Sequence, residues 1–145
     1  MEVVVDTNVL INGLFCIDPH AARILDLISN GTLKMVYSEG IRKEYAYILG
    51  KKFPEFLSAE NLLQLRILLE NSKMVSPSFN LIISSDPSDN MFMECAVCAK
   101  ANAFITSDYK NDLIRLAIYR SVRICDPATF LREKGFLHLK IGVLT

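Results

Sequence analysis

Acidic side chains at intervals along the chain could carry the chemistry of this protein. They are Asp6, Glu44, Asp89 and Asp108, with a fifth acid, Asp112, one turn after Asp108. Carboxylates that are brought together repel one another, so such a cluster is costly unless a cation fills it. Oxygen ligands with no nearby His or Cys suit Mg²⁺ or Mn²⁺. Carboxylate-held ions of this kind serve phosphoryl and phosphodiester chemistry.

Each of these acids also has an ordinary structural interpretation. Asp6 and Asp108 could be loop acids at strand ends. Asp89 could serve only the dipole of its helix, which favours an acid in the first turn. Glu44 could be a solvated helix residue. For each acid taken alone, the structural role is the more common one. The acids therefore indicate a metal site only when all of them are considered together and in this order.

Strand and helix signals alternate along the chain. Strands are predicted at residues 3–5, 33–37, 103–106 and 122–125, a shorter one at 74–75, and a loop or edge strand at 81–83. Helices are predicted to begin at the caps Asp18, Ser38, Ser58, Asp86 and Asp126, with a further helix around residues 113–117. This alternation predicts a three-layer α/β/α sandwich with a mostly parallel sheet.

The predicted elements place the acids near one another. Asp6 and Asp108 each follow a strand, and parallel strands present their carboxyl ends at the same edge of a sheet. Asp89 falls in the first turn of a helix on that connection side. Glu44 lies on the shoulder of the buried face of a helix that follows a strand.

A chain of 145 residues fits one domain with a proper core, which we place at residues 1–135. Residues 136–145 are predicted to be a strand-like tail, because Leu137, Leu139, Ile141 and Val143 alternate with other residues. A bare apolar stripe is unfavourable on a monomer, so we expect an added edge strand or an interface arm, for example in a homodimer.

The chain has 16 basic and 16 acidic residues, so contact with nucleic acid would need a local basic patch. Candidate RNA-binding residues are Arg42, Lys43, Lys51, Lys52 and Lys110. Ordinary solvated faces explain these cations equally well. No N-terminal signal segment and no stretch of transmembrane length occurs, so we expect a soluble, cytoplasmic protein with no membrane association.

The spacing Cys95-x-x-Cys98 resembles half a zinc site. No second cysteine pair or nearby histidine pair completes four ligands. Both residues fall in an apolar helical pattern, where a free cysteine packs as a small hydrophobic residue. We therefore predict a core role for this pair and reduced thiols throughout.

Four short motifs together resemble a known family. They are Asp6-Thr7-Asn8 followed by Val9-Leu10, Glu44-Tyr45, Asp86-Pro87-Ser88-Asp89-Asn90, and Thr106-Ser107-Asp108. From about Val3 to Leu131 the sequence is similar to PIN-domain ribonucleases, and most similar to toxin-type (VapC-like) prokaryotic PIN proteins. The resemblance implies a flavodoxin-like sandwich, endonucleolytic cleavage of RNA with Mg²⁺ or Mn²⁺, and an antitoxin protein as a partner.

The same resemblance assigns roles to individual residues. It implies a catalytic metal site formed by Asp6, Glu44, Asp89 and Asp108, with Asp112 as an additional carboxylate. It implies hydrogen-bonding support from Thr7, Asn8 and Thr106.

Two other functions stay open. An acidic-pocket phosphotransferase or phosphatase also places an Asp after the first strand. The haloacid-dehalogenase type, however, has a second Asp at the position where this chain has Asn8. The receiver type has a Lys after a late strand, and in this chain no such Lys follows Ile124. The other is a non-catalytic relative that only binds RNA or protein, and retention of the four acids argues against it.

Overall fold

The computed structural model describes residues 1–52, 54, 59–107 and 112–136. Within them the strands form a six-stranded sheet of order β3-β2-β1-β4-β6-β5. The strands are β1 (Glu2–Val5), β2 (Lys34–Tyr37), β3 (Lys73–Met74), β4 (Ala103–Ile105), β5 (Ile118–Tyr119) and β6 (Val122–Cys125). Every neighbouring pair is parallel except β5 and β6. The predicted, mostly parallel sheet is therefore confirmed.

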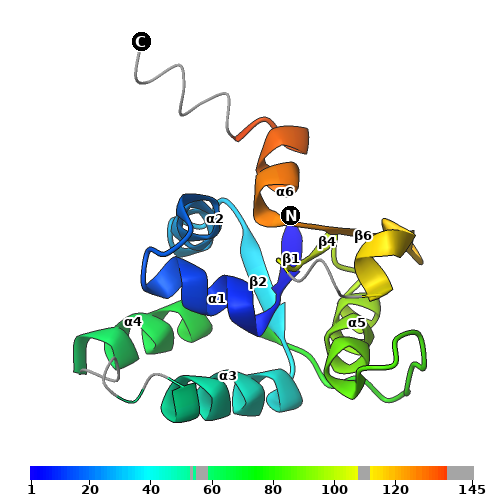
Figure 1. The fold of residues 1–145 in the computed structure, drawn as a ribbon, viewed down its shortest axis with the longest axis horizontal. Coiled ribbons are helices and arrows are strands. Elements are labelled where there is room, and N and C mark those ends of the chain that lie inside the picture. The colour runs from blue at the N-terminus through cyan, green and yellow to red at the C-terminus, as the bar shows by residue number, and fades with distance from the viewer. Residues whose placement is uncertain (53, 55–58, 108–111, 137–145) are drawn as a thin grey trace.

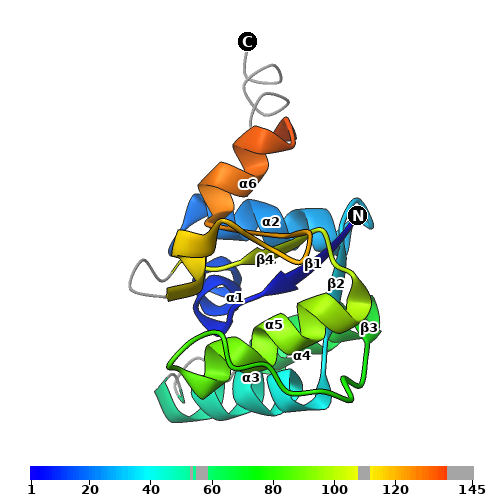
Figure 2. The ribbon, with the colours of Figure 1, turned by 90° about the vertical axis from the view of Figure 1, so that its right-hand side faces the viewer.

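Helices cover both faces of this sheet. They are α1 (Thr7–Leu14), α2 (Pro19–Ser29), α3 (Glu39–Lys52), α4 (Ala59–Glu70), α5 (Pro87–Ala99) and α6 (Pro127–Glu133), with a 3-10 helix η2 (Asp112–Leu116). Figure 1 shows α1 and α2 on one side of the sheet and α5 on the other. Figure 2, turned by 90°, shows α5 running across the face of the sheet opposite α2. The arrangement is the predicted α/β/α sandwich.

Three helices begin as the Asp-Pro signals predict. Asp18, Asp86 and Asp126 are N-caps whose carboxylates accept backbone N–H groups, and each is followed by a proline in the first turn. The cap satisfies a donor that the helix itself cannot, and proline supplies a helical φ at a position that needs no N–H. These helix starts depend only on residues that are close together in the sequence, so the sequence predicted them correctly.

The predictions are less accurate near the sheet edges. The helix predicted at residues 113–117 is only the short 3-10 helix η2. Ala117 has a φ of 60° and accepts a hydrogen bond from the Ile124 N–H at 2.7 Å, so the chain turns into β5 and leaves the helix. The two-residue strand β5 was not predicted, and residues 81–83 form a loop. Most of the predicted tail, residues 137–145, lies outside the described residues.

The central strand β1 positions Asp6, the first residue of the predicted acidic site. Val3, Val4 and Val5 are fully buried. Val5 is in register with Ile105 of β4, so these two strands end level with each other. The residues after them, Asp6 and Thr106, therefore emerge at the same edge of the sheet.

In the part of the chain that the structure describes, none of the helices combines the length and apolar character needed to cross a membrane.

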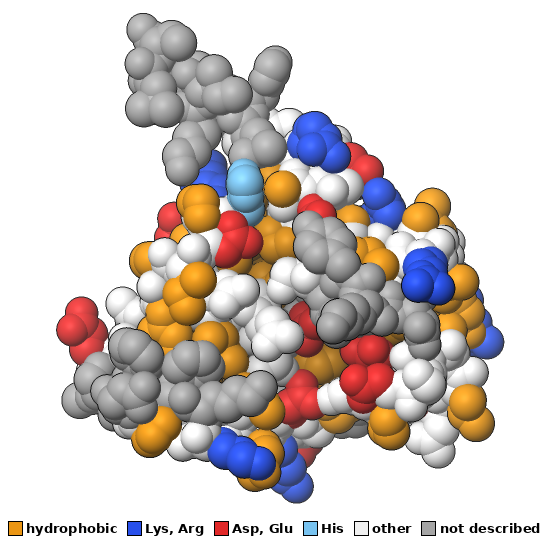
Figure 3. All heavy atoms as spheres, viewed as in Figure 1, with side chains coloured by type: hydrophobic (Ala, Val, Ile, Leu, Met, Phe, Trp, Pro, Cys, Tyr) orange, Lys and Arg blue, Asp and Glu red, His pale blue; other side chains and the backbone are white. Residues whose placement is uncertain are grey.

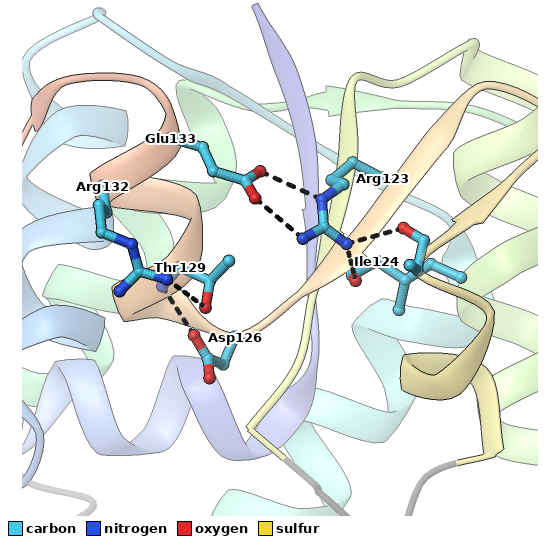
Figure 4. Close-up of polar contacts among 7 residues, drawn as sticks. Arg123, Ile124, Asp126, Thr129, Arg132 and Glu133 are labelled. Atoms are coloured by element: carbon cyan, nitrogen blue, oxygen red, sulfur yellow. Dashed lines mark hydrogen bonds and ion pairs between the residues drawn. The ribbon is translucent and has the colours of Figure 1, made fainter.

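An arginine on β6 ties helix α6 to the sheet (Figure 4). Arg123 donates from Nε and Nη2 to the Glu133 carboxylate at 3.1 and 2.9 Å. Its Nη1 donates to the carbonyl oxygens of Ala117 and Ile124 at 2.9 and 2.8 Å. The guanidinium therefore joins three segments through one planar group, a geometry that lysine cannot reproduce.

We expect Arg123→Lys to lower the free energy of unfolding by about 0.5–1 kcal/mol, the range of a partly exposed ion pair. Hydrogen bonding by Arg123 is the main cause that lowers the pKa of Glu133. A carboxyl with a lowered folded-state pKa adds stability above its unfolded pKa, and this is lost as pH falls through the folded-state pKa. Thermal melts should therefore show the deficit at neutral pH and a smaller one in acid. A loss of stability in Arg123→Lys that stays constant down to acid pH would contradict this role. The matched control is Arg132→Lys on α6.

Candidate active site

Asp6 stands where β1 ends and α1 begins, and it is 8% exposed. It occupies the N-cap position of α1, yet its side chain makes no capping hydrogen bond. Its Oδ2 instead accepts the Thr106 hydroxyl from the end of β4 at 2.7 Å. The carboxylate therefore points across the carboxyl edge of the sheet. It does not bond to the first N–H groups of the helix, as an N-cap acid usually does.

Glu44 on α3 connects two distant parts of the chain. The Thr7 hydroxyl donates to Oε2 of Glu44 at 2.5 Å, and the Ser88 hydroxyl donates to Oε1. Thr7 directly follows Asp6, and Ser88 directly precedes Asp89. The half-buried Glu44 carboxylate therefore contacts the residue after Asp6 and the residue before Asp89.

The position of α3 depends on the neighbouring residue. Tyr45 is fully buried, and its hydroxyl donates to the carbonyl oxygen of Val5 at 2.5 Å. Burial raises the pKa of the Tyr45 phenol well above its usual value, and the negative charges of Asp6 and Glu44 raise it further, so the group stays a hydrogen-bond donor. This bond fastens α3 to the end of β1 one residue before Asp6.

Asp89 lies in the first turn of α5 and is 8% exposed. The Ser84 hydroxyl donates to its Oδ2 at 3.4 Å. Because Asp86 caps the helix, Asp89 itself is not needed as the cap. Figure 3 shows acidic side chains gathered near the middle of this face of the molecule, over the region between α3 and α5.

The other predicted site residues have different outcomes. Asp108 lies outside the described residues, and of Asp112 only the backbone, at the start of η2, is described. Asn8 is exposed on the first turn of α1. The hydrogen bonds of Ser84 and Ser88 were not predicted as functional. Ser88 adjoins Asp89 in the sequence, but no sequence signal marks Ser84.

Four of the five predicted RNA-binding cations belong to α3, namely Arg42, Lys43, Lys51 and Lys52. Arg42 pairs with Glu39 at 2.5 Å, so part of its charge is already neutralised. Lys43 is exposed beside Glu44, and Lys51 donates to the Tyr47 hydroxyl at 3.1 Å. The Lys52 side chain and Lys110 lie outside the described atoms. Their contact with RNA stays a prediction.

The donor chemistry of the site fits a hard divalent cation. Asp6, Glu44 and Asp89 offer carboxylate oxygens, which Mg²⁺ and Mn²⁺ prefer. Among residues 1–52, 54, 59–107 and 112–136, no three His, Cys, Asp or Glu side chains are close enough to hold a metal ion. These three described acids therefore do not form a complete metal site by themselves, and the predicted ligand Asp108 lies outside the described part.

We expect Cys95 and Cys98 on α5 to bind no metal. Cys95 is fully buried, and burial raises the pKa of its thiol to about 12, whereas metals bind the thiolate. Elemental analysis of protein purified without added zinc should find far less zinc than protein. Stoichiometric zinc that is lost in a Cys95→Ser, Cys98→Ser double variant would contradict the core role.

Comparison with known proteins agrees with this architecture. No curated protein matches the chain. Among solved structures, the crystal structure of VapBC2 from Rickettsia felis bound to a DNA fragment from their promoter is similar. Its TM-score is 0.58 at 18% sequence identity, over 86% of this chain and 97% of that chain, which is a likeness of fold. The family model of the PIN domain matches residues 2–110. The chain that builds this acidic sheet edge therefore belongs to the PIN domain family.

Proposed function

We propose that this protein is a metal-dependent endoribonuclease that hydrolyses RNA phosphodiester bonds. The observation that carries the proposal is the placement of Glu44. Its carboxylate accepts hydroxyl groups from Thr7 and Ser88, the sequence neighbours of Asp6 and Asp89. Glu44 on α3 thus contacts the residue that follows Asp6 and the residue that precedes Asp89, near the carboxyl edge of a parallel sheet, where α/β proteins place their ligands.

In the proposed site the carboxylates would hold the cation. The ligands would be Asp6, Glu44, Asp89 and Asp108, with Asp112 as a further carboxylate. When bound, Mg²⁺ or Mn²⁺ lowers the pKa of a water molecule and stabilises the charge on the scissile phosphate and the leaving oxygen. With the cation in this role, the chain needs no side-chain base.

Hydroxyl groups around the carboxylates would fix their orientation. Thr106 holds one oxygen of Asp6, and Thr7 and Ser88 hold the two oxygens of Glu44. A carboxylate that is already oriented loses less freedom when it binds a cation, which is why such outer contacts matter in metal sites.

Membership of the PIN domain family favours phosphodiester hydrolysis over phosphotransfer of the haloacid-dehalogenase or receiver type. A non-catalytic RNA- or protein-binding relative is the remaining alternative, and a cleavage assay separates the two. We propose incubation of a labelled single-stranded RNA and a DNA of the same sequence with Mg²⁺, Mn²⁺ or EDTA. Internal cleavage of the RNA that requires the cation supports the proposal. Binding of RNA without cleavage in any metal would favour the non-catalytic alternative.

We also propose an antitoxin protein as the partner. Support comes from the likeness of fold to VapBC2, because that structure contains both members of such a pair. We expect the product of the neighbouring open reading frame to co-elute with this chain after co-expression and to suppress RNA cleavage. Separate elution together with unchanged cleavage would contradict the pairing.

A further inference from the structure

The loop before α5 is held by side chains of that helix. The Asn90 amide oxygen accepts the N–H groups of Ile83 and Ser84 at 3.0 and 2.8 Å, and its Nδ2 donates to the Ser84 carbonyl oxygen at 2.9 Å. One turn further along, the Glu94 carboxylate accepts the Leu81 N–H at 2.8 Å. This segment has no strand pairing, so these side chains replace the backbone partners that a sheet would supply.

This anchoring fixes the place of one buried hydroxyl. Ser84 is 7% exposed, although it belongs to a loop. Its Oγ accepts the Asp86 N–H at 3.1 Å, so an oxygen lone pair is occupied and the hydroxyl proton remains for another acceptor. That acceptor is Oδ2 of Asp89 at 3.4 Å. The contact is long for a hydrogen bond between two oxygen atoms.

We propose that Ser84, held in place by Asn90, is a positioning residue for Asp89. It orients the Asp89 carboxylate for the cation and contacts neither cation nor RNA itself. The inference rests on the proposed function and deepens it. It says that the orientation of one proposed metal ligand, Asp89, depends on Ser84, a loop residue outside the acidic motif. Asn90 suits the anchoring role because its amide both accepts from and donates to the backbone of Ser84. A side chain that can only donate or only accept hydrogen bonds cannot do this.

The test is a Mn²⁺ titration of Ser84→Ala, followed by thermal melting and, separately, by RNA cleavage. Ser84→Ala keeps the backbone bonds to Asn90 and removes only the hydroxyl. We expect a 10- to 100-fold higher Mn²⁺ concentration at half-maximal effect in both readouts, the usual cost of losing an outer contact in a metal site. Ser84→Thr, which restores the hydroxyl, should recover most of the affinity. Ser78→Ala, an exposed serine of the same loop, should titrate as wild type.

Melting in EDTA identifies a variant that simply unfolds. Asn90→Ala provides a second test, because it removes the bonds that hold the backbone of Ser84. A wild-type Mn²⁺ midpoint in both Ser84→Ala and Asn90→Ala would overturn the inference, while RNA cleavage by wild type would leave the proposed function standing. If wild type is stabilised by Mn²⁺ but cleaves no RNA, the proposed function fails. A raised midpoint in Ser84→Ala would then still support the positioning role.

Discussion

Glu44→Gln is expected to reduce cation-dependent RNA cleavage by at least about a hundredfold. A bound metal supplies several kcal/mol of transition-state stabilisation, and every 1.4 kcal/mol corresponds to about tenfold in rate. Glutamine has nearly the same shape, and the hydroxyl groups of Thr7 and Ser88 can rotate to meet an amide. The variant therefore removes a charge and a ligand and leaves the packing of α3 unchanged.

The melting temperatures should separate this loss from a loss of stability. In EDTA, Glu44→Gln should be as stable as wild type or more so, because it removes one of several neighbouring negative charges. At a hundredfold excess of Mn²⁺ over its dissociation constant, wild type should gain about 2.7 kcal/mol, and the variant should gain much less.

Glu39→Gln is the matched control, since Glu39 lies on the same helix but is exposed and pairs with Arg42. It should cleave RNA and respond to Mn²⁺ as wild type does. If Glu44→Gln cleaves RNA at the wild-type rate and retains the whole gain in stability, Glu44 is not a metal ligand. The shared acidic site would then be wrong.

Phe92→Ala is expected to cost about 3–5 kcal/mol of folding free energy, the usual penalty for removing a buried aromatic ring. Phe92 on α5 is 1% exposed and stacks on Phe104 of β4 with ring centroids 5.5 Å apart. Its ring is also 6.3 Å from that of Tyr45 on α3. A domain of this size has only about 5–15 kcal/mol of net stability, so this single change would remove a large part of it.

Urea denaturation should show the loss as a lower midpoint. Phe92→Leu keeps most of the apolar volume and should cost clearly less. Tyr47→Ala removes an aromatic ring that is 60% exposed on α3 and should change stability by no more than about 0.5 kcal/mol. A cost below about 1 kcal/mol for Phe92→Ala would mean that this aromatic contact does not hold α3, α5 and β4 together.

The sequence by itself determined most of the elements and the edge of the sheet at which chemistry could occur. The caps Asp18, Asp86 and Asp126 and the buried run that ends at Asp6 are encoded by residues a few positions apart. Local steric preferences and capping hydrogen bonds act over that distance, so a sequence pattern can predict them. The end of η2 at Ala117 was missed because it depends on a hydrogen bond from Ile124 on a neighbouring strand.

Only the tertiary structure decided the contacts of Glu44. Glu44 is 37 residues from Thr7 and 44 from Ser88, and no local pattern encodes those contacts. They exist because Tyr45 bonds to the end of β1 and Phe92 packs between Tyr45 and Phe104. The order of the acids predicted that they could converge. The packing of two helices against one sheet sets which oxygen of Glu44 faces which hydroxyl group, because that choice depends on contacts between residues far apart in the chain.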